Sequence, residues 1–375
     1  MYKLMTPGPT SVPQTVMDAR SRWFPNPDVD TSFCEEYHRV CLKLAELLHT
    51  ENEVYIMDGE GILGLEAGCA SLTEPGDRVL VIDNGIYGKG FADFVSMYGG
   101  VPVLYTVDYR HPVDVDALAG FLATDHDFKY ATVVHCDTPS GMLNDVASIC
   151  PLLKSYGILT MVDSVSAMFG ADFRVDDWQI DLACGGSQKA LSAPSGLTFV
   201  AVSDDALAAM ENRKTPIASF YCNILTFKNY YRDKWFPYTM PASDIYGLEE
   251  AVDIVAADSD RIDCHRRIAK AVRNAVTAAG LSLYLLDGFS PTVTVVNVPD
   301  GISADDIIET MKNEYGILVS GSFDYLAGKV IRIGHMGNSA NEKDVADTLD
   351  ALQKTLHRLG FNCKCDMKKE FESGL

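Results

Sequence analysis

The chain has no run of the roughly 18 to 20 consecutive apolar residues that a membrane-spanning helix requires. No long apolar stretch precedes Pro7 at the N-terminus, which argues against a secretory signal peptide. Repeats, low-complexity linkers and long blocks of one charge are also missing. We therefore expect a protein that has no membrane partner and resides in the cytoplasm.

Basic residues are few, and paired cysteine motifs are absent. The chain has 31 Lys and Arg residues against 52 Asp and Glu residues, and its net charge of −21 repels nucleic acid and anionic lipid. We expect neither as a partner. The ten cysteines form no CxxC pair and lie mostly in apolar segments, which favours reduced, buried thiols. Cys363 and Cys365 have no further Cys close by, so we predict no metal site and interpret them as part of a tail.

The length and composition of the chain are typical of a globular protein with a large core. Its 375 residues are 47% hydrophobic and 22% charged, and this length favours two domains. We expect an N-terminal segment over residues 1–15, a large domain over 16–245 and a smaller C-terminal domain over 246–375.

The large domain has the pattern of an α/β fold with a mostly parallel sheet. Short runs that are apolar on both faces indicate strands covered on both sides. They lie at 53–57, 79–83, 101–107, 130–136, 158–163, 180–184 and 197–202. Helical stretches such as 62–73 and 145–156 separate them. In such sheets, ligands bind beyond the carboxyl ends of the strands.

The C-terminal part has a different pattern, typical of a small α+β domain. One long helical stretch is expected from about Ile245 to Ala279. Strands at 293–298 and 329–333 with helices at 303–315 and 341–358 complete this domain.

Polar residues follow the first two strands at their carboxyl ends. The turn Asp58-Gly59-Glu60-Gly61 enters a helix at Ile62, where free N–H groups can hold a phosphate. Such a turn can also serve only helix packing, and a carboxylate at Glu60 is unfavourable beside phosphate. Tyr87 follows the next strand and can stack on a ring, although an ordinary surface or core tyrosine has the same pattern.

The remaining strand ends carry an acid, hydroxyls and a lysine. Asp137 and Thr138 follow one strand, and Asp163 ends another, where a buried carboxyl must cap a helix, accept a hydrogen bond or bind a ligand. Lys189 lies in a short polar stretch between two apolar strands, together with Ser187 and Ser192 as candidate phosphate contacts. A desolvated lysine of this kind can form a Schiff base.

Together these strand ends offer the parts of a pyridoxal phosphate (PLP) site. PLP needs a phosphate cradle, a stacked aromatic ring, an acid at the pyridine nitrogen, a donor to its phenolic oxygen and a lysine. The chain places candidates for all five at one edge of one predicted sheet.

Several motifs resemble the class V aminotransferases of the fold-type I PLP enzymes, most closely the alanine–glyoxylate and serine–pyruvate group. They are Thr6-Pro7-Gly8-Pro9-Thr10, Gly59-Glu60-Gly61, Glu74-Pro75-Gly76-Asp77, Asn84-Gly85-Ile86-Tyr87-Gly88, Val162-Asp163-Ser164-Val165, Gly186-Ser187-Gln188-Lys189-Ala190-Leu191 and Arg332-Ile333-Gly334. The resemblance covers nearly the whole chain. It implies a large domain with a seven-stranded, mostly parallel sheet, and a homodimer with shared active sites.

The resemblance also implies roles for single residues. Lys189 corresponds to the Schiff-base lysine, Gln188 to a phosphate or substrate contact, Asp163 to the acid at the pyridine nitrogen, Tyr87 to the stacked ring and Thr138 to the donor to the ring oxygen. Gly61 and Ile62, beside Glu60, correspond to the phosphate cradle, Thr239 to a residue that reaches the phosphate of the neighbouring subunit, Arg332 to the clamp on the substrate carboxylate, and Gly8 to a residue that lines the substrate pocket.

The sequence is compatible with more than one role for Glu60 and for Arg332. Many relatives have Ser where this chain has Glu60, so Glu60 should turn away from phosphate, pair with a cation or reshape the substrate pocket. Arg332 can equally form a structural ion pair. His335 follows the same strand, where it can reach the pocket, but we expect it to have a plain surface role.

The expected reaction is a ping-pong transamination through pyridoxamine phosphate, from a small amino acid such as alanine or serine to glyoxylate or pyruvate. Asp163 and Lys189 are the expected catalytic residues. Alternatives are an aminophosphonate–pyruvate aminotransferase, a lyase or desulfurase of the same fold, and a non-catalytic protein that binds a phosphorylated metabolite.

Overall fold

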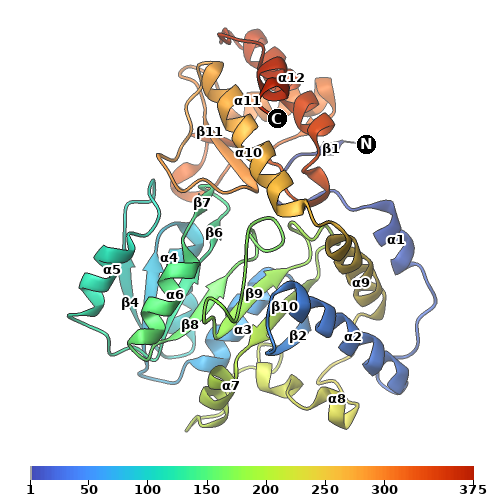
Figure 1. The fold of residues 1–375 in the computed structure, drawn as a ribbon, viewed down its shortest axis with the longest axis vertical. Coiled ribbons are helices and arrows are strands. Elements are labelled where there is room, and N and C mark those ends of the chain that lie inside the picture. The colour runs from blue at the N-terminus through green and yellow to red at the C-terminus, as the bar shows by residue number, and fades with distance from the viewer. Residues whose placement is uncertain (1) are drawn as a thin grey trace.

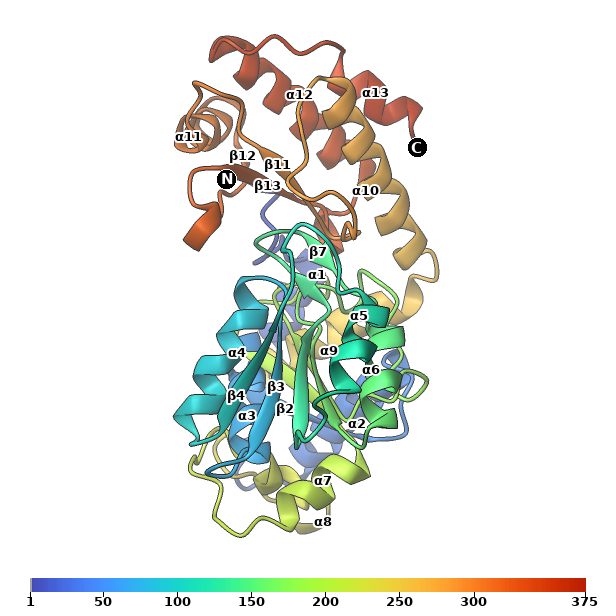
Figure 2. The same cartoon turned by 90° about the vertical axis from the view of Figure 1, so that its left-hand side faces the viewer.

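The computed structural model describes residues 2–375, which form two lobes (Figures 1 and 2). A seven-stranded sheet fills the larger lobe. In spatial order its strands are β2 (Glu53–Asp58), β10 (Leu197–Val202), β9 (Leu182–Gly186), β8 (Leu159–Asp163), β5 (Tyr130–Val134), β3 (Arg78–Asp83) and β4 (Val101–Thr106). All seven strands predicted from the sequence are confirmed.

Six of these strands are parallel, and only β10 runs against its neighbours β2 and β9. The carboxyl ends of the six parallel strands therefore meet at one edge, as predicted for the fold class. This edge faces the smaller lobe (Figure 2).

Helices cover both faces of the sheet, with α3 and α4 on one side and α5 and α6 on the other (Figure 2). The helices of this lobe are α1 (Gln14–Arg20), α2 (Thr31–Leu47), α3 (Gly61–Leu72), α4 (Ile86–Met97), α5 (Val115–Leu122), α6 (Val146–Ser155), α7 (Asp204–Glu211), α8 (Tyr230–Asp233) and α9 (Ala242–Ala257). Because both faces are covered, the strand residues are apolar throughout rather than alternating.

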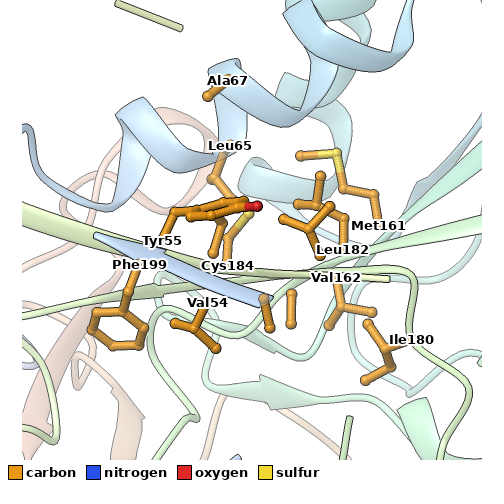
Figure 3. Close-up of a cluster of buried hydrophobic side chains, with 14 of the residues drawn as sticks. Val54, Tyr55, Leu65, Ala67, Met161, Val162, Ile180, Leu182, Cys184 and Phe199 are labelled. Atoms are coloured by element: carbon orange, nitrogen blue, oxygen red, sulfur yellow. The ribbon is translucent and has the colours of Figure 1, made fainter. Parts of the chain in front are cut away.

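Helix α3 lies very close to the sheet because it carries glycines on its inner face. A Cβ at Gly64 would come within 2.4 Å of the Thr198 hydroxyl oxygen, so no larger residue fits there. Figure 3 shows Leu65 and Ala67 of α3 above the strand side chains Tyr55 and Leu182. This packing brings the N-terminus of α3 to the carboxyl edge of the sheet.

The smaller lobe has its own core, made by helices on a two-stranded sheet. Its elements are α10 (Arg261–Ala278), β11 (Val293–Asn297), α11 (Ala304–Tyr315), β12 (Ile317–Leu318), β13 (Val330–Gly334), α12 (Glu342–Arg358) and α13 (Met367–Ser373). A hairpin of β6 (Cys136–Asp137) and β7 (Met142–Leu143) extends toward it from the larger lobe. Strand β1 (Lys3–Leu4) pairs with β12, so the N-terminal segment begins on the smaller lobe and crosses to the larger one.

The single helix expected from Ile245 to Ala279 is in fact two helices, α9 and α10, separated at Asp258–Asp260. Asp and Ser side chains compete for backbone hydrogen bonds, which favours a helix end. The apolar residues of α9 belong to the core of the larger lobe, whereas those of α10 belong to the smaller core. We therefore propose that the domain boundary lies at 258–260 rather than at 245/246.

The tail after Gly360 is a structured part of the smaller lobe. Helix α13 packs on α10 and α12, and its side chains Met367 and Phe371 are fully buried. Cys363 and Cys365 pack against the same core. This helix was not predicted from the sequence, because only these few apolar residues indicate its buried face.

No helix within residues 2–375 has both the length and the hydropathy to cross a bilayer.

Candidate active site

A pocket of about 130 Å³ lies at the carboxyl edge of the sheet, and residues of the N-terminal segment and the larger lobe line it. It is lined by Gly8, Pro9, Glu60, Gly61, Ile62, Leu65, Tyr87, Thr138, Asp163, Val165, Ser166, Gln188 and Lys189. The N-terminal segment and five strand ends thus converge here. Nine of the eleven residues that the family resemblance assigns to the site line this pocket, and the two outside it are Arg332 and Thr239.

The pocket lining includes two ionisable groups with little exposure to solvent, the buried Asp163 and the partly buried Lys189. Burial, together with the positive charge of Arg332, lowers the pKa of the Lys189 amine to about 8. Burial raises the pKa of the Asp163 carboxyl to about 7, although the N–H of Val165 donates to its Oδ1 at 2.9 Å. A lysine that is partly neutral and an acid that is partly protonated near pH 7 are the marks of a reactive site.

The N-terminal segment closes the pocket over Lys189. Nζ of Lys189 donates to the carbonyl oxygen of Pro7 at 2.9 Å. Gly8 has a φ of +98°, and a Cβ there would lie 2.4 Å from Cδ and 2.6 Å from Nζ of Lys189. Only glycine therefore combines this backbone conformation with this close approach.

Tyr87 and Thr138 form the wall on the other side of the pocket. The N–H of Tyr87 donates to Oδ1 of the buried Asp137 at 3.0 Å, and Oδ2 of the same carboxyl accepts from the Ser140 hydroxyl at 2.6 Å. Asp137 thereby fixes the start of α4, where Tyr87 lies. The Thr138 hydroxyl is hydrogen-bonded to the Ser166 hydroxyl beside the pocket.

The end of the pocket at the N-terminus of α3 contains a carboxylate. Glu60 precedes the helix without capping it, and its Oε2 accepts from Nε2 of Gln188 at 2.9 Å. Because Nε2 faces the carboxylate, the other amide atom of Gln188, Oε1, is left as a buried acceptor without a donor. Of the three outcomes expected for Glu60, pairing with a cation is not observed within residues 2–375, because its partner is a neutral amide. The side chain is part of the pocket lining.

Arg332 lies just beyond the pocket wall. Its Nε donates to Gly321 O at 2.7 Å, and Nη1 lies 3.4 Å from Thr138 O. The side chain is partly buried, and no carboxylate within residues 2–375 forms an ion pair with it. The structural ion pair considered from the sequence is therefore absent from the described chain, and Nη2 donates to no group within residues 2–375.

Three sequence-based assignments lie elsewhere. Thr239 is exposed, and its hydroxyl donates to Asp28. Ser187 and Ser192 point into the protein, where Ser187 Oγ donates to Pro194 O at 2.6 Å and Ser192 Oγ accepts from the N–H of Asn338 at 2.8 Å. The expectation that these two serines contact phosphate is not supported by these positions.

The prediction of a surface role for His335 is wrong. His335 is fully buried, with Nε2 hydrogen-bonded to the Thr294 hydroxyl at 2.8 Å and Nδ1 near Pro291 O at 3.1 Å. Burial lowers its pKa to about 3, so the ring is neutral. The residue joins β11 to the end of β13, a strand pairing that the sequence alone does not specify.

Sequence reasoning missed the residues that act through position rather than chemistry. Pro7 and Ser166 contact Lys189 and Thr138, and Val165 lines the pocket. Asp137 was noted as a carboxylate after a strand, but its contact with Tyr87 was not predicted. The motifs around them were recognised, yet their contacts depend on the backbone path of the loops.

The profile of the family Aminotransferase class-V matches residues 3–345. The chain belongs to the class V aminotransferases. A pyridoxamine–pyruvate transaminase of Mesorhizobium japonicum is 35% identical over 89% of this chain and 86% of its own length. An uncharacterised aminotransferase of Methanocaldococcus jannaschii is 34% identical over 96% of this chain and 94% of its own. The crystal structure of ureidoglycine–glyoxylate aminotransferase from Bacillus subtilis superimposes with a TM-score of 0.96, at 28% identity, and covers 100% of this chain and 98% of the other.

This class V aminotransferase shares the fold-type I architecture of those neighbours, so both the fold and the enzyme class predicted from the sequence are confirmed. Further relatives are named as glyoxylate aminotransferases for serine, aspartate and alanine. No cysteine is among the residues that line the pocket, so the desulfurase alternative finds no nucleophile there.

Proposed function

We propose that this class V aminotransferase uses PLP to move an amino group from a small amino acid to a small 2-oxo acid such as glyoxylate or pyruvate. The observation that carries the proposal is the pairing, in one buried pocket, of Lys189 with a lowered pKa and Asp163 with a raised one. The names of the relatives support this substrate class.

The ring end of the pocket fits a pyridine ring. The Val165 N–H occupies only Oδ1 of Asp163, which leaves Oδ2 to hold a proton on a ring nitrogen. Tyr87 supplies an aromatic face and Thr138 a hydroxyl donor. When bound, PLP supplies an electron sink that acidifies the Cα–H bond of the amino donor.

The residues of the chain supply the remaining chemistry. The Lys189 amine holds the cofactor and, when free, moves a proton to and from the substrate Cα as general base and acid. Arg332 binds the substrate carboxylate, for which a guanidinium without an acidic partner is suited. Pro7 and Gly8 cover Lys189 and exclude water from it.

We also propose that the protein is a homodimer and that a second subunit supplies part of each site. Thr239 is exposed and lies outside the pocket of its own chain. We infer that it completes the phosphate end of the pocket in a neighbouring subunit, as the resemblance implies.

A second candidate function follows from Glu60. PLP brings a phosphate dianion to the N-terminus of α3, where Gly61 and Ile62 offer N–H groups. The carboxylate of Glu60 opposes that charge, and Gln188 presents a second acceptor, Oε1, rather than a donor. A hydroxymethyl group, which can donate a hydrogen bond, fits these acceptors better.

This chemistry favours pyridoxamine itself as the amino donor, with pyruvate as the acceptor. Both a similar sequence and a similar structure carry the name of that activity. The structure, from Mesorhizobium loti, has a TM-score of 0.94 at 32% identity and covers 99% of this chain and 96% of its own.

Absorbance spectra of the purified protein decide between the two candidates. The protein is mixed with PLP or with pyridoxal, and small amino acids are then added to each sample. A Schiff-base band with PLP that bleaches with an amino acid supports the first candidate. A band with pyridoxal only, together with pyridoxal release from pyridoxamine and pyruvate, supports the second. The absence of a band with either compound rejects both.

A further inference from the structure

A second cleft, of about 600 Å³, is lined by residues of α6 and α10, among others. Both helices lie on the same side of the molecule in Figure 2. Residues of both lobes line the cleft, and none of them lines the active-site pocket. The function proposed above makes no use of this cleft.

Three cations line this cleft from one helix. Arg266, Lys270 and Arg273 follow one another at intervals of four and three residues, which places them on one face of α10. Arg266 is paired with Asp172 and Asp263. Among residues 2–375, Lys270 and Arg273 have no ion-pair partner.

Arg273 is the most notable of the three, because it is partly buried without a compensating charge. Its Nη1 donates to Ser290 O at 3.2 Å, and its guanidinium lies 5.2 Å from the centre of the Phe289 ring. Burial lowers its pKa to about 10. A buried, unpaired guanidinium is costly unless an anion joins it.

The two carboxylates in the cleft wall are already engaged. Asp172 pairs with Arg266. Asp145 caps α6, where it accepts from the N–H of Ser148 at 3.2 Å and from its hydroxyl at 2.7 Å. The first residues of α6, Val146 and Ala147, also line the cleft, and they present the positive end of the helix dipole.

His135 provides an independent indication of a ligand. Its ring lines the cleft although only 3% of the residue is exposed. Nδ1 is 3.0 Å from the Ser164 hydroxyl, whereas Nε2 has no hydrogen-bond partner within residues 2–375. Burial lowers the pKa to about 4, so the ring is neutral and Nε2 can donate a proton or accept one in a hydrogen bond.

We propose that this cleft binds a small organic anion, in which a carboxylate or phosphate group on an aromatic or apolar body contacts Lys270, Arg273 and His135. The apolar wall comes from Trp178, Phe289 and Pro291. In a chain of net charge −21, a cleft with two unpaired cations is a specific place for an anion. The anion would lie between α10 of the smaller lobe and the N-terminus of α6 in the larger lobe.

The site is also linked to the catalytic pocket through His135. The N–H of His135 donates to Asp163 O at 2.8 Å, and its ring contacts the next residue, Ser164. An anion bound to His135 would therefore contact a residue that is itself hydrogen-bonded to Asp163, the acid of the active site, and to its neighbour Ser164.

The test is a calorimetric titration of the purified full-length protein with phenyl phosphate, with benzoate and with phenol. The variants Lys270→Glu and Arg273→Gln should each weaken phenyl phosphate binding by roughly tenfold or more, because each removes a charge-assisted hydrogen bond. Lys270 is exposed, so its variant tests the site even if Arg273→Gln fails to fold. Arg267→Gln is the matched control, because Arg267 lies on the same helix, pairs with Asp260 and does not line the cleft.

Binding of either anion that is lost in Lys270→Glu and kept in Arg267→Gln supports the proposal, and the tighter of the two anions identifies the preferred group. Two results overturn it. One is the absence of binding by both anions at millimolar concentration. The other is binding that phenol reproduces or that both cleft variants retain.

Discussion

The amine of Lys189 donates a hydrogen bond to the carbonyl oxygen of Pro7, across 182 positions of sequence. The acceptor is a neutral carbonyl, so the hydrogen bond leaves the charge of the lysine without a counter-ion. Burial and the nearby Arg332 therefore both act to lower its pKa. The N-terminal segment thus belongs to the active site and covers the amine that the proposed mechanism uses.

Replacement of Lys189 with Ala should lower transamination turnover by at least roughly 10²- to 10⁴-fold, the contribution expected of a general acid–base group. The variant should still fold but melt slightly below the parent protein, because the Pro7 carbonyl oxygen loses its donor, which costs about 1–3 kcal/mol. Turnover measured with the preferred donor checks this, and a variant with normal turnover rules out the assignment of Lys189.

The reactivity of Lys189 should depend on pH with a midpoint near 8. Only the neutral amine attacks a carbonyl, so its reaction with pyridoxal should speed up as the pH rises through about 8 and then level off. An ordinary lysine would continue to gain reactivity until about pH 10.4. The protein is mixed with pyridoxal at pH values from about 6 to about 11, a range that includes both midpoints. Borohydride then traps the Schiff base on Lys189, and mass spectrometry measures the trapped fraction at each pH and so gives the midpoint. A midpoint near 10 contradicts the prediction.

Replacement of Asp163 with Asn should have opposite effects on activity and on stability. Turnover should fall, because Asn cannot keep a ring nitrogen protonated. The ligand-free protein should become more stable at pH 8. Burial raises the Asp163 pKa to about 7, so the contribution of this carboxyl to stability is present below its unfolded pKa of about 4 and is lost as the pH rises through 7.

Melting temperatures of the wild type and Asp163→Asn from pH 4 to pH 8 test the stability effect. The advantage of the variant should be largest at pH 8 and should disappear toward pH 4. An advantage that does not vary with pH would mean that the carboxyl of Asp163 is not the group responsible.

Replacement of Glu60 with Ser should change the preference between phosphorylated and free ligands. Removing the carboxylate should raise the affinity for PLP by roughly tenfold or more, because a like charge beside a dianion is costly. Affinity for pyridoxal should fall if Glu60 accepts from its hydroxymethyl group. Glu60→Gln keeps the size and removes the charge, so it separates repulsion from shape. Equal affinities for PLP in all three proteins would show that Glu60 lies away from the phosphate.

Replacement of Gly8 with Ala should lower activity by roughly 10²-fold, since misplacement of a reacting group by about 1 Å has this effect. The added Cβ would lie 2.4 Å from Cδ of Lys189. Gly76→Ala is a matched control, because Gly76 also has a positive φ, +87°, but has no atom within 4 Å of its Cβ position. A similar loss of activity in both variants would point to backbone strain instead of displacement of Lys189.

Replacement of Phe371 with Ala should destabilise the smaller lobe by about 3–5 kcal/mol, the usual range for a buried aromatic residue. Phe371 is fully buried and anchors α13 on α10 and α12. Urea unfolding followed by circular dichroism measures this loss, with Lys369→Ala, an exposed change on the same helix, as the control. An unchanged midpoint for Phe371→Ala would mean that the tail contributes nothing to the lobe.

The sheet and most of the pocket could be predicted from the order of the amino acids. The strands were recognisable because a sheet covered on both faces needs continuous apolar runs, as at Tyr130–Val134. The residues after those strands could be grouped because parallel strands end at the same edge. Asp163, Tyr87, Thr138 and Lys189 line one pocket for this reason.

Contacts between groups that lie far apart in the sequence could be seen only in the tertiary structure. The contacts of Pro7 with Lys189, of Glu60 with Gln188 and of His335 with Thr294 depend on how loops and lobes pack. Hydrophobic periodicity specifies which face of an element is buried but leaves open which partner covers it. The membership of α9 in the larger core and the docking of α13 were decided in the same way, by packing between elements distant in sequence.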